Sequence, residues 1–137
     1  MEKINLIQMK AKIFSLFIVG IALFSSCTAQ SGRYQNVSVD QLKEKLSDDI
    51  IVLDVRTTGE VAQGVIGDPK IIDFNGGEFL EAAKKLPKDK PIYVYCAVGG
   101  RSSSAAGMLA KEGFSNIYNV EGGIQAWQKK GFPLSKK

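Results

Sequence analysis

Four short, nearly uninterrupted apolar runs constrain the fold of this chain more than any other feature of its sequence. They lie at residues 50–55, 71–73, 92–95 and 117–120 and are rich in isoleucine, valine and tyrosine. Such short runs are typical of strands that are covered on both faces, as in a parallel sheet. Segments with helical spacing separate them, so the sequence predicts an α/β fold with a mostly parallel sheet.

Two of the intervening helices begin at recognisable capping signals. Ser38 with Gln41, and Thr57 with Glu60, have the spacing of capping boxes. They predict a helix over residues 38–46 and a helix of one to two turns after Thr57. Further helices are expected at residues 78–86, after residues 102–104 and at residues 124–130. A short edge strand is expected at residues 35–37.

The first residues have the layout of an export signal. A basic head is followed by an apolar block at residues 13–24, and Ser25 and Ser26 then precede Cys27. The block suits a signal-peptide core and is short for a bilayer span. This end resembles a bacterial lipoprotein signal, in which cleavage precedes the cysteine and the thiol is acylated. An ordinary cleaved signal, or an uncleaved anchor with Cys27 incidental, stays open as an alternative.

The resemblance divides the chain into three parts. Residues 1–26 are the signal peptide, 27–34 are the lipidated Cys27 and a tether, and 35–137 form one domain. We expect an exported protein held by lipid to a membrane of the cell envelope, on the periplasmic side. Thr28 follows the cysteine where aspartate is the usual inner-membrane retention signal, which favours the outer membrane.

Charge and composition exclude some partners. Without residues 1–26 the chain keeps 15 of 18 basic and 13 of 14 acidic residues, a net charge of +2. Both signs are mixed along the chain, and no basic run exceeds two residues, so we expect no nucleic acid partner. We also expect a monomer, without a metal site or a cofactor.

Cysteine usage directs attention to one residue. If Cys27 carries lipid, Cys96 is the only thiol and can form no internal disulfide. The sequence contains no histidine, so a Cys-His dyad is excluded. A thiol that works as a nucleophile must then be stabilised as thiolate by other groups.

The loop after Cys96 can supply those groups. Cys96 ends the run at 92–95 and is followed by the predicted substrate-binding residues, Ala97, Val98, Gly99, Gly100, Arg101 and Ser102. The two glycines permit positive φ values that turn backbone N–H groups inward, and a helix capped by residues 102–104 adds its positive end. We expect this loop to favour an anion at the sulfur, either a thiolate or a persulfide, and Arg101 to neutralise an anionic donor such as thiosulfate by paired hydrogen bonds.

Residues 95–102, Tyr-Cys-Ala-Val-Gly-Gly-Arg-Ser, resemble the C-x-x-G-x-R-S active-site loop of rhodanese-like sulfurtransferases. Residues 53–56, with Glu60 and Gly64 after them, resemble the family's first block, and residues 119–133 resemble its closing block. The resemblance implies a rhodanese-like fold, with about five mostly parallel strands flanked by helices on both faces. It also implies transfer of sulfane sulfur from a donor such as thiosulfate to a thiol or cyanide, through a persulfide on Cys96.

Other functions stay open beside this one. A sulfur carrier or a protein-binding module could use the same domain. Phosphatases and arsenate reductases of related fold place five residues between cysteine and arginine, whereas four separate Cys96 from Arg101 here, which disfavours them. Asp54 and Arg56, at a strand end, are interpreted as a structural brace near the site.

Overall fold

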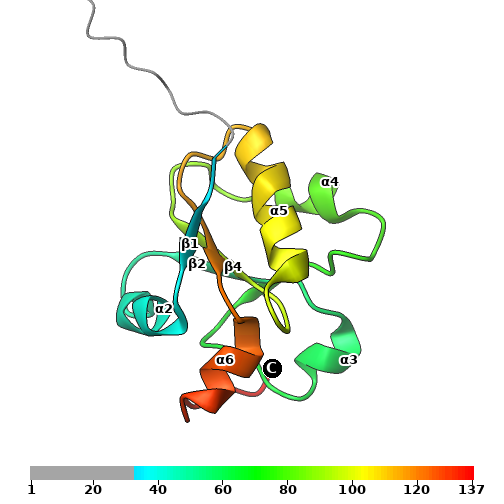
Figure 1. Ribbon diagram of the computed structural model, residues 1–137. Helices are drawn as coiled ribbons and strands as arrows, with labels where there is room; N and C mark the ends of the chain where they lie inside the picture. The colour runs from blue at the N-terminus through cyan, green and yellow to red at the C-terminus, as the bar shows by residue number, and fades with distance from the viewer. Residues whose placement is uncertain (1–32) are drawn as a thin grey trace, which may run out of the picture.

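The computed structural model describes residues 33–137 (Figure 1). The predicted signal peptide, Cys27 and most of the tether therefore lie outside the described residues. Five strands of the described part form one parallel sheet in the order β1-β5-β4-β2-β3. They are β1 (Gln35–Val37), β2 (Ile51–Asp54), β3 (Lys70–Ile71), β4 (Ile92–Tyr95) and β5 (Ile117–Val120). None of the helices formed by residues 33–137 has the length and apolarity needed to cross a membrane.

Helices cover both faces of this sheet, as predicted. They are α2 (Val39–Lys45), α3 (Thr58–Val61), α4 (Phe79–Ala83), α5 (Gly100–Lys111) and α6 (Gly123–Lys129). One apolar cluster joins strand side chains to α4 and α5, and a second joins the opposite side of the strands to α2 and α6. Burial on two faces explains why β2 and β4 read as continuous apolar runs.

Both predicted capping boxes are present. The Ser38 hydroxyl accepts a hydrogen bond from the Gln41 amide at 3.2 Å, and the Gln41 side chain accepts one from the Ser38 amide at 2.8 Å. Thr57 and Glu60 make the same reciprocal pair at the start of α3. These bonds satisfy backbone amides that have no partner within the helix.

The prediction that Ser102 to Ser104 cap the helix after the cysteine is wrong. The helix begins earlier, at Gly100, and its N-cap is Gly99 with φ of 111°. Glycine adopts this left-handed conformation without a Cβ clash, so the chain turns into the helix directly after the loop. Gly100 needs no positive φ. Because Gly99 has no side chain to cap the helix, its first amides stay available to other acceptors.

Smaller differences concern element ends. The predicted helix at 78–86 is shorter, Phe79–Ala83, and the predicted strand at 71–73 pairs with β2 one residue earlier, as Lys70–Ile71. Both lie on exposed or short elements, where few contacts fix the boundary.

The carboxyl ends of β2 and β4 and the starts of α5 and α6 meet at one edge of the sheet. The first amides of α6 hold the cysteine loop: Ile124 donates to the Cys96 carbonyl at 2.9 Å and Gln125 to the Ala97 carbonyl at 3.1 Å. Gly123 lies so close that an added Cβ would stand 2.3 Å from the Cys96 carbonyl oxygen. A glycine at position 123, the first residue of α6, is therefore required by this close approach.

Candidate active site

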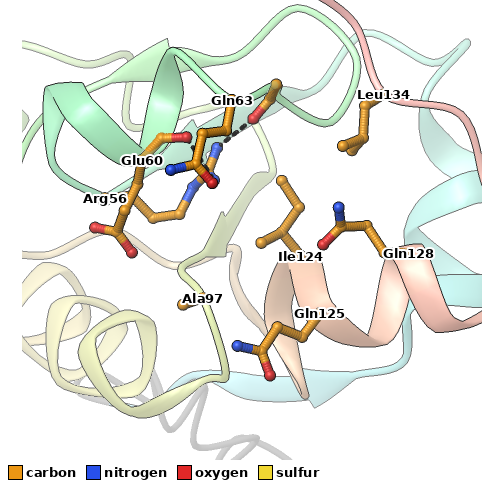
Figure 2. A pocket seen from close by; sticks show the side chains of 9 residues that line it. Arg56, Glu60, Gln63, Ala97, Ile124, Gln125, Gln128 and Leu134 are labelled. Carbon is orange, nitrogen blue, oxygen red and sulfur yellow. Dashed lines mark hydrogen bonds between the residues drawn. The ribbon is translucent and has the colours of Figure 1, made fainter.

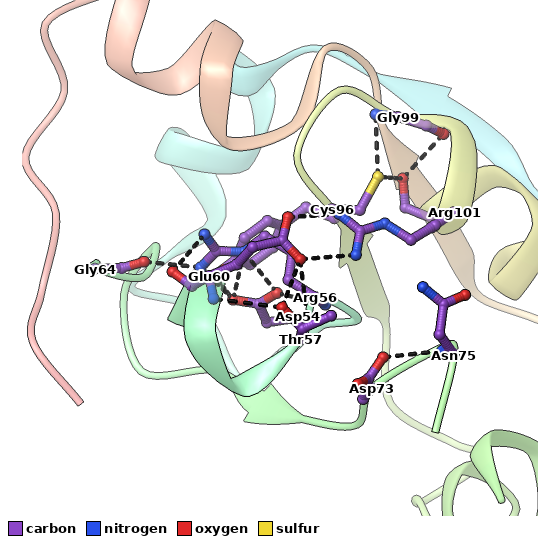
Figure 3. A network of polar contacts seen from close by, with 12 residues as sticks. Asp54, Arg56, Thr57, Glu60, Gly64, Asp73, Asn75, Cys96, Gly99 and Arg101 are labelled. Carbon is purple, nitrogen blue, oxygen red and sulfur yellow. Dashed lines mark hydrogen bonds and ion pairs between the residues drawn. The ribbon is translucent and has the colours of Figure 1, made fainter. Parts of the chain in front are cut away.

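The Cys96 sulfur lies at the end of β4, against the first turn of α5 (Figure 3). The Gly99 amide donates a hydrogen bond to Sγ at 3.1 Å. The Cys96 thiol contacts the Ser102 hydroxyl oxygen at 3.5 Å, and that hydroxyl donates to the Gly99 carbonyl at 3.1 Å. The predicted arrangement, in which peptide groups of the loop face the sulfur, is present.

Polar contacts of the loop decide the acidity of this thiol. Burial raises the pKa of Cys96, but the Ser102 hydroxyl and the backbone amides of Ser102, Gly99 and Val98 lower it by more. The net pKa is below its ordinary value. A thiolate is thus favoured by peptide dipoles and a hydroxyl, in a site without histidine.

The Cys96 thiol is buried beneath the loop. Cys96 is only 1% exposed and belongs to the apolar cluster under α5, whereas Val98 in the same loop is 60% exposed. The reason is the early helix start: Gly99 and Ser102 fold over the sulfur instead of leaving it at the loop surface.

Arg101 lies beside the cysteine, but its guanidinium is already paired. Its two terminal nitrogens donate to the two carboxylate oxygens of Glu60, at 2.8 Å and 2.6 Å (Figure 3). The hydrogen bonds from Arg101 lower the pKa of Glu60 to about 2, against partial burial and with help from Thr57. The hydrogen bond to Glu60 raises the pKa of Arg101, and the nearby Cys96 adds to that increase. Glu60 and Arg101 are therefore both charged near neutral pH.

A buried ion pair supports the loop from the neighbouring strand. Asp54 is fully buried and Arg56 is 4% exposed, and their side chains are joined by hydrogen bonds of 2.7–3.1 Å. The Tyr95 hydroxyl donates to Asp54 at 2.6 Å, and Arg56 donates to the carbonyls of Glu60 and Gly64. This network ties β2, β4 and α3 together, which is the brace role predicted for Asp54 and Arg56.

A pocket of about 150 Å³ opens next to the loop (Figure 2). Its lining comes from α3, the loop itself, α6 and the chain near the C-terminus: Arg56, Glu60, Gln63, Gly64, Ala97, Ile124, Gln125, Gln128 and Leu134. Three glutamines and one carboxylate supply most of its polar groups. Its size suits a small donor or acceptor molecule.

The sequence pattern of the rhodanese-like domain matches residues 38–130, which include every strand and helix around Cys96 except β1. The chain belongs to the rhodanese-like domain family. Its similarity to named members extends over most of their length. It is 32% identical over 100 residues to a sulfurtransferase of Allochromatium vinosum, covering 72% of this chain and 92% of that protein.

Another curated relative and two solved structures also show similarity to rhodanese-like proteins. The chain is 31% identical over 98 residues to the thiosulfate sulfurtransferase GlpE of Pseudomonas aeruginosa, covering 72% of this chain and 87% of that one. A rhodanese-related protein from Thermoplasma volcanium has a structure with a TM-score of 0.70 at 36% identity, covering 76% of this chain and all of that one. A rhodanese-like domain protein from Staphylococcus aureus gives 0.65 at 32% identity, over 75% and 98% of the two chains.

The rhodanese site contains most of the residues expected from sequence and two that were not. Cys96, Val98, Gly99 and Ser102 surround the sulfur, Ala97 lines the pocket, and Gly100 begins α5. The sequence predicts Glu60 as a helix cap and as part of the family's first block, and Tyr95 as the last residue of the run at 92–95, but neither as a side chain of the site. The spacing of Thr57 and Glu60 reveals the cap, but nothing in the sequence indicates that the same carboxylate reaches Arg101.

The Ser102 hydroxyl gives a test of the thiolate cradle. Since it is the largest of the groups that lower the pKa of Cys96, Ser102→Ala should raise that pKa. Alkylation requires the thiolate, so its rate falls as pH drops through the thiol pKa. We expect the iodoacetamide rate of wild type to have its midpoint below that of an ordinary thiol, and the variant to shift it upward. Exposed Ser104→Ala is the matched control; an unchanged midpoint in Ser102→Ala would contradict the assignment.

Proposed function

We propose that this rhodanese-like protein is a sulfurtransferase that carries sulfane sulfur as a persulfide on Cys96. The observation that carries the proposal is the Gly99 amide and its neighbouring donors directed at a histidine-free thiol with a lowered pKa. The sulfurtransferase names of its relatives support the same reaction class. The name of one relative, thiosulfate sulfurtransferase, makes thiosulfate the first donor to test, and a thiol or cyanide is the acceptor.

The reaction proceeds in two balanced displacements. The Cys96 thiolate attacks the outer sulfur of thiosulfate, a new S–S bond forms, and the old S–S bond breaks with its electron pair leaving on sulfite. The resulting persulfide carries its negative charge on the terminal sulfur, where backbone amides of the loop can stabilise it. An acceptor thiolate or cyanide then attacks that sulfur, and Cys96 leaves as thiolate. No external oxidant or reductant is needed.

The assay that tests the proposal compares two reaction classes on the purified protein. With thiosulfate and cyanide we expect catalytic formation of thiocyanate, and with a phosphotyrosine mimic we expect no hydrolysis. The four-residue spacing from Cys96 to Arg101 supports this outcome, because a loop one residue shorter than that of the related phosphatases should leave less room for a tetrahedral oxyanion. Phosphate ester hydrolysis without thiocyanate would favour the phosphatase alternative. Persulfide formation without turnover would favour the sulfur-carrier alternative.

We also propose that the protein is an exported lipoprotein anchored through Cys27. The support is the sequence pattern alone: a basic head, a short apolar block and small residues before the cysteine. Metabolic labelling with a palmitate analogue should mark wild type and not Cys27→Ser. A freely soluble secreted product without label would overturn the anchor.

A further inference from the structure

The position of Glu60 bears on which donors the site accepts. Its carboxylate receives four hydrogen bonds: two from Arg101 at 2.8 Å and 2.6 Å, and two from the amide and hydroxyl of Thr57 at 3.0 Å and 2.9 Å. Both side chains of the ion pair are partly buried, with Arg101 24% and Glu60 32% exposed. A carboxylate held at both ends cannot turn away from the guanidinium at low cost.

The pocket beside the loop contains no compensating positive charge. Among its nine lining residues the only cation is Arg56, which is bound to Asp54 and to two carbonyl oxygens. The other polar side chains, apart from Glu60, are neutral glutamines. The charges of Arg101 and Glu60 cancel each other, and so do the charges of Arg56 and Asp54. When Cys96 is a thiolate, the net charge of the site is therefore negative.

Resting on the sulfurtransferase function proposed above, we propose that Glu60 is a specificity-determining residue. By pairing with both terminal nitrogens of Arg101 and neutralising its charge, it makes the site favour sulfane donors with one negative charge, such as thiosulfonates and persulfides, over dianions such as thiosulfate. A dianion approaching this site meets the thiolate and the Glu60 carboxylate before it meets an unpaired cation. Coulomb energy scales with ligand charge, so the penalty on a dianion is twice that on a monoanion.

Thiosulfate and methanethiosulfonate form a matched pair of probes. Both transfer an outer sulfur to a thiolate and release the rest of the molecule, as sulfite or as methanesulfinate. They differ chiefly in one anionic oxygen replaced by a methyl group. Initial rates with cyanide as acceptor give kcat/KM for each donor.

The variant to compare is Glu60→Gln. Glutamine can still accept the hydrogen bond from Thr57, because capping boxes use either residue, while the negative charge is removed and Arg101 is released. A charge roughly 7 Å away in water-like surroundings changes affinity about threefold per unit of ligand charge. We expect kcat/KM to rise about threefold for methanethiosulfonate and about tenfold for thiosulfate, mainly through KM.

The control is Asp49→Asn, which makes the same change of net charge. Asp49 pairs with Lys90 at 2.6 Å and precedes β2, at the opposite edge of the sheet from Cys96. It should leave the ratio of the two kcat/KM values unchanged. An unchanged ratio in Glu60→Gln, or an equal loss with both donors, would overturn the charge role and leave Glu60 a structural residue.

Inhibition of the wild-type protein tests the idea independently of any variant's folding. Methanesulfonate and sulfate have similar shapes and carry one and two charges. Methanesulfonate should compete with the donor more strongly than sulfate, and stronger inhibition by sulfate would refute the proposal. Failure of the sulfurtransferase function itself looks different, because then neither donor forms a persulfide on Cys96.

Discussion

Replacing the Cys96 sulfur by oxygen, in Cys96→Ser, should abolish thiocyanate formation, with a loss of about a thousandfold or more in rate. A serine hydroxyl is not ionised near neutral pH, and the loop holds no histidine to take its proton. The amides that lower the pKa of the thiol cannot bring a hydroxyl into the same range. Steady-state thiocyanate assays on purified wild type and variant measure the effect.

Folding must be separated from chemistry in this comparison. Serine is slightly smaller than cysteine, and Ser102 and Gly99 offer its hydroxyl partners, so the variant should show the wild-type circular dichroism spectrum. Ser104→Ala, an exposed position on α5, should retain wild-type rates. Turnover by a folded Cys96→Ser protein above a tenth of wild type would show that the sulfur of Cys96 is not the carrier.

The second large effect concerns stability. Asp54→Asn should destabilise the protein by about 3 to 5 kcal/mol, because it leaves the Arg56 guanidinium buried without a counter-charge. The side chain keeps nearly the same volume, so the loss reports charge rather than packing. Urea denaturation followed by tryptophan fluorescence measures it, since Trp127 is buried in the native state.

Two variants with smaller expected effects serve as comparisons. Tyr95→Phe removes a hydroxyl that donates to Asp54 at 2.6 Å and accepts from the Ile66 amide at 3.0 Å. It should cost about 1 to 3 kcal/mol, the range for a buried group left without its partner. Asp49→Asn breaks a surface pair and should leave the denaturation midpoint near wild type. If Asp54→Asn were as mild as Asp49→Asn, the buried pair would not be the brace described here.

Periodicity was sufficient to predict the layers of this fold. The apolar runs of β2 and β4, the capping boxes at Ser38 and Thr57, and the position of Cys96 at a strand end depend on local sequence, and the structure contains them all. Each of these features can be predicted from residues that are close together in the sequence. The same holds for the brace, since Asp54 and Arg56 stand two residues apart.

Tertiary contacts explain what the sequence could not predict. The pairing of Arg101 with Glu60 spans 41 positions, and the bond from Tyr95 to Asp54 spans the same distance. The three serines suggested a helix cap, but the left-handed turn at Gly99 started the helix first. Because the helix starts at Gly100, its first turn covers Cys96. The periodicity of apolar residues does not predict where a helix starts to this precision.

The most direct test of the persulfide on Cys96 is the intact mass of the protein. After incubation with thiosulfate or methanethiosulfonate and removal of excess donor, wild type should gain about 32 Da, one sulfur atom. Peptide mapping should place that mass on Cys96, and added cyanide should remove it and release one equivalent of thiocyanate. A protein that forms thiocyanate without ever carrying the added sulfur on Cys96 would contradict the mechanism proposed here.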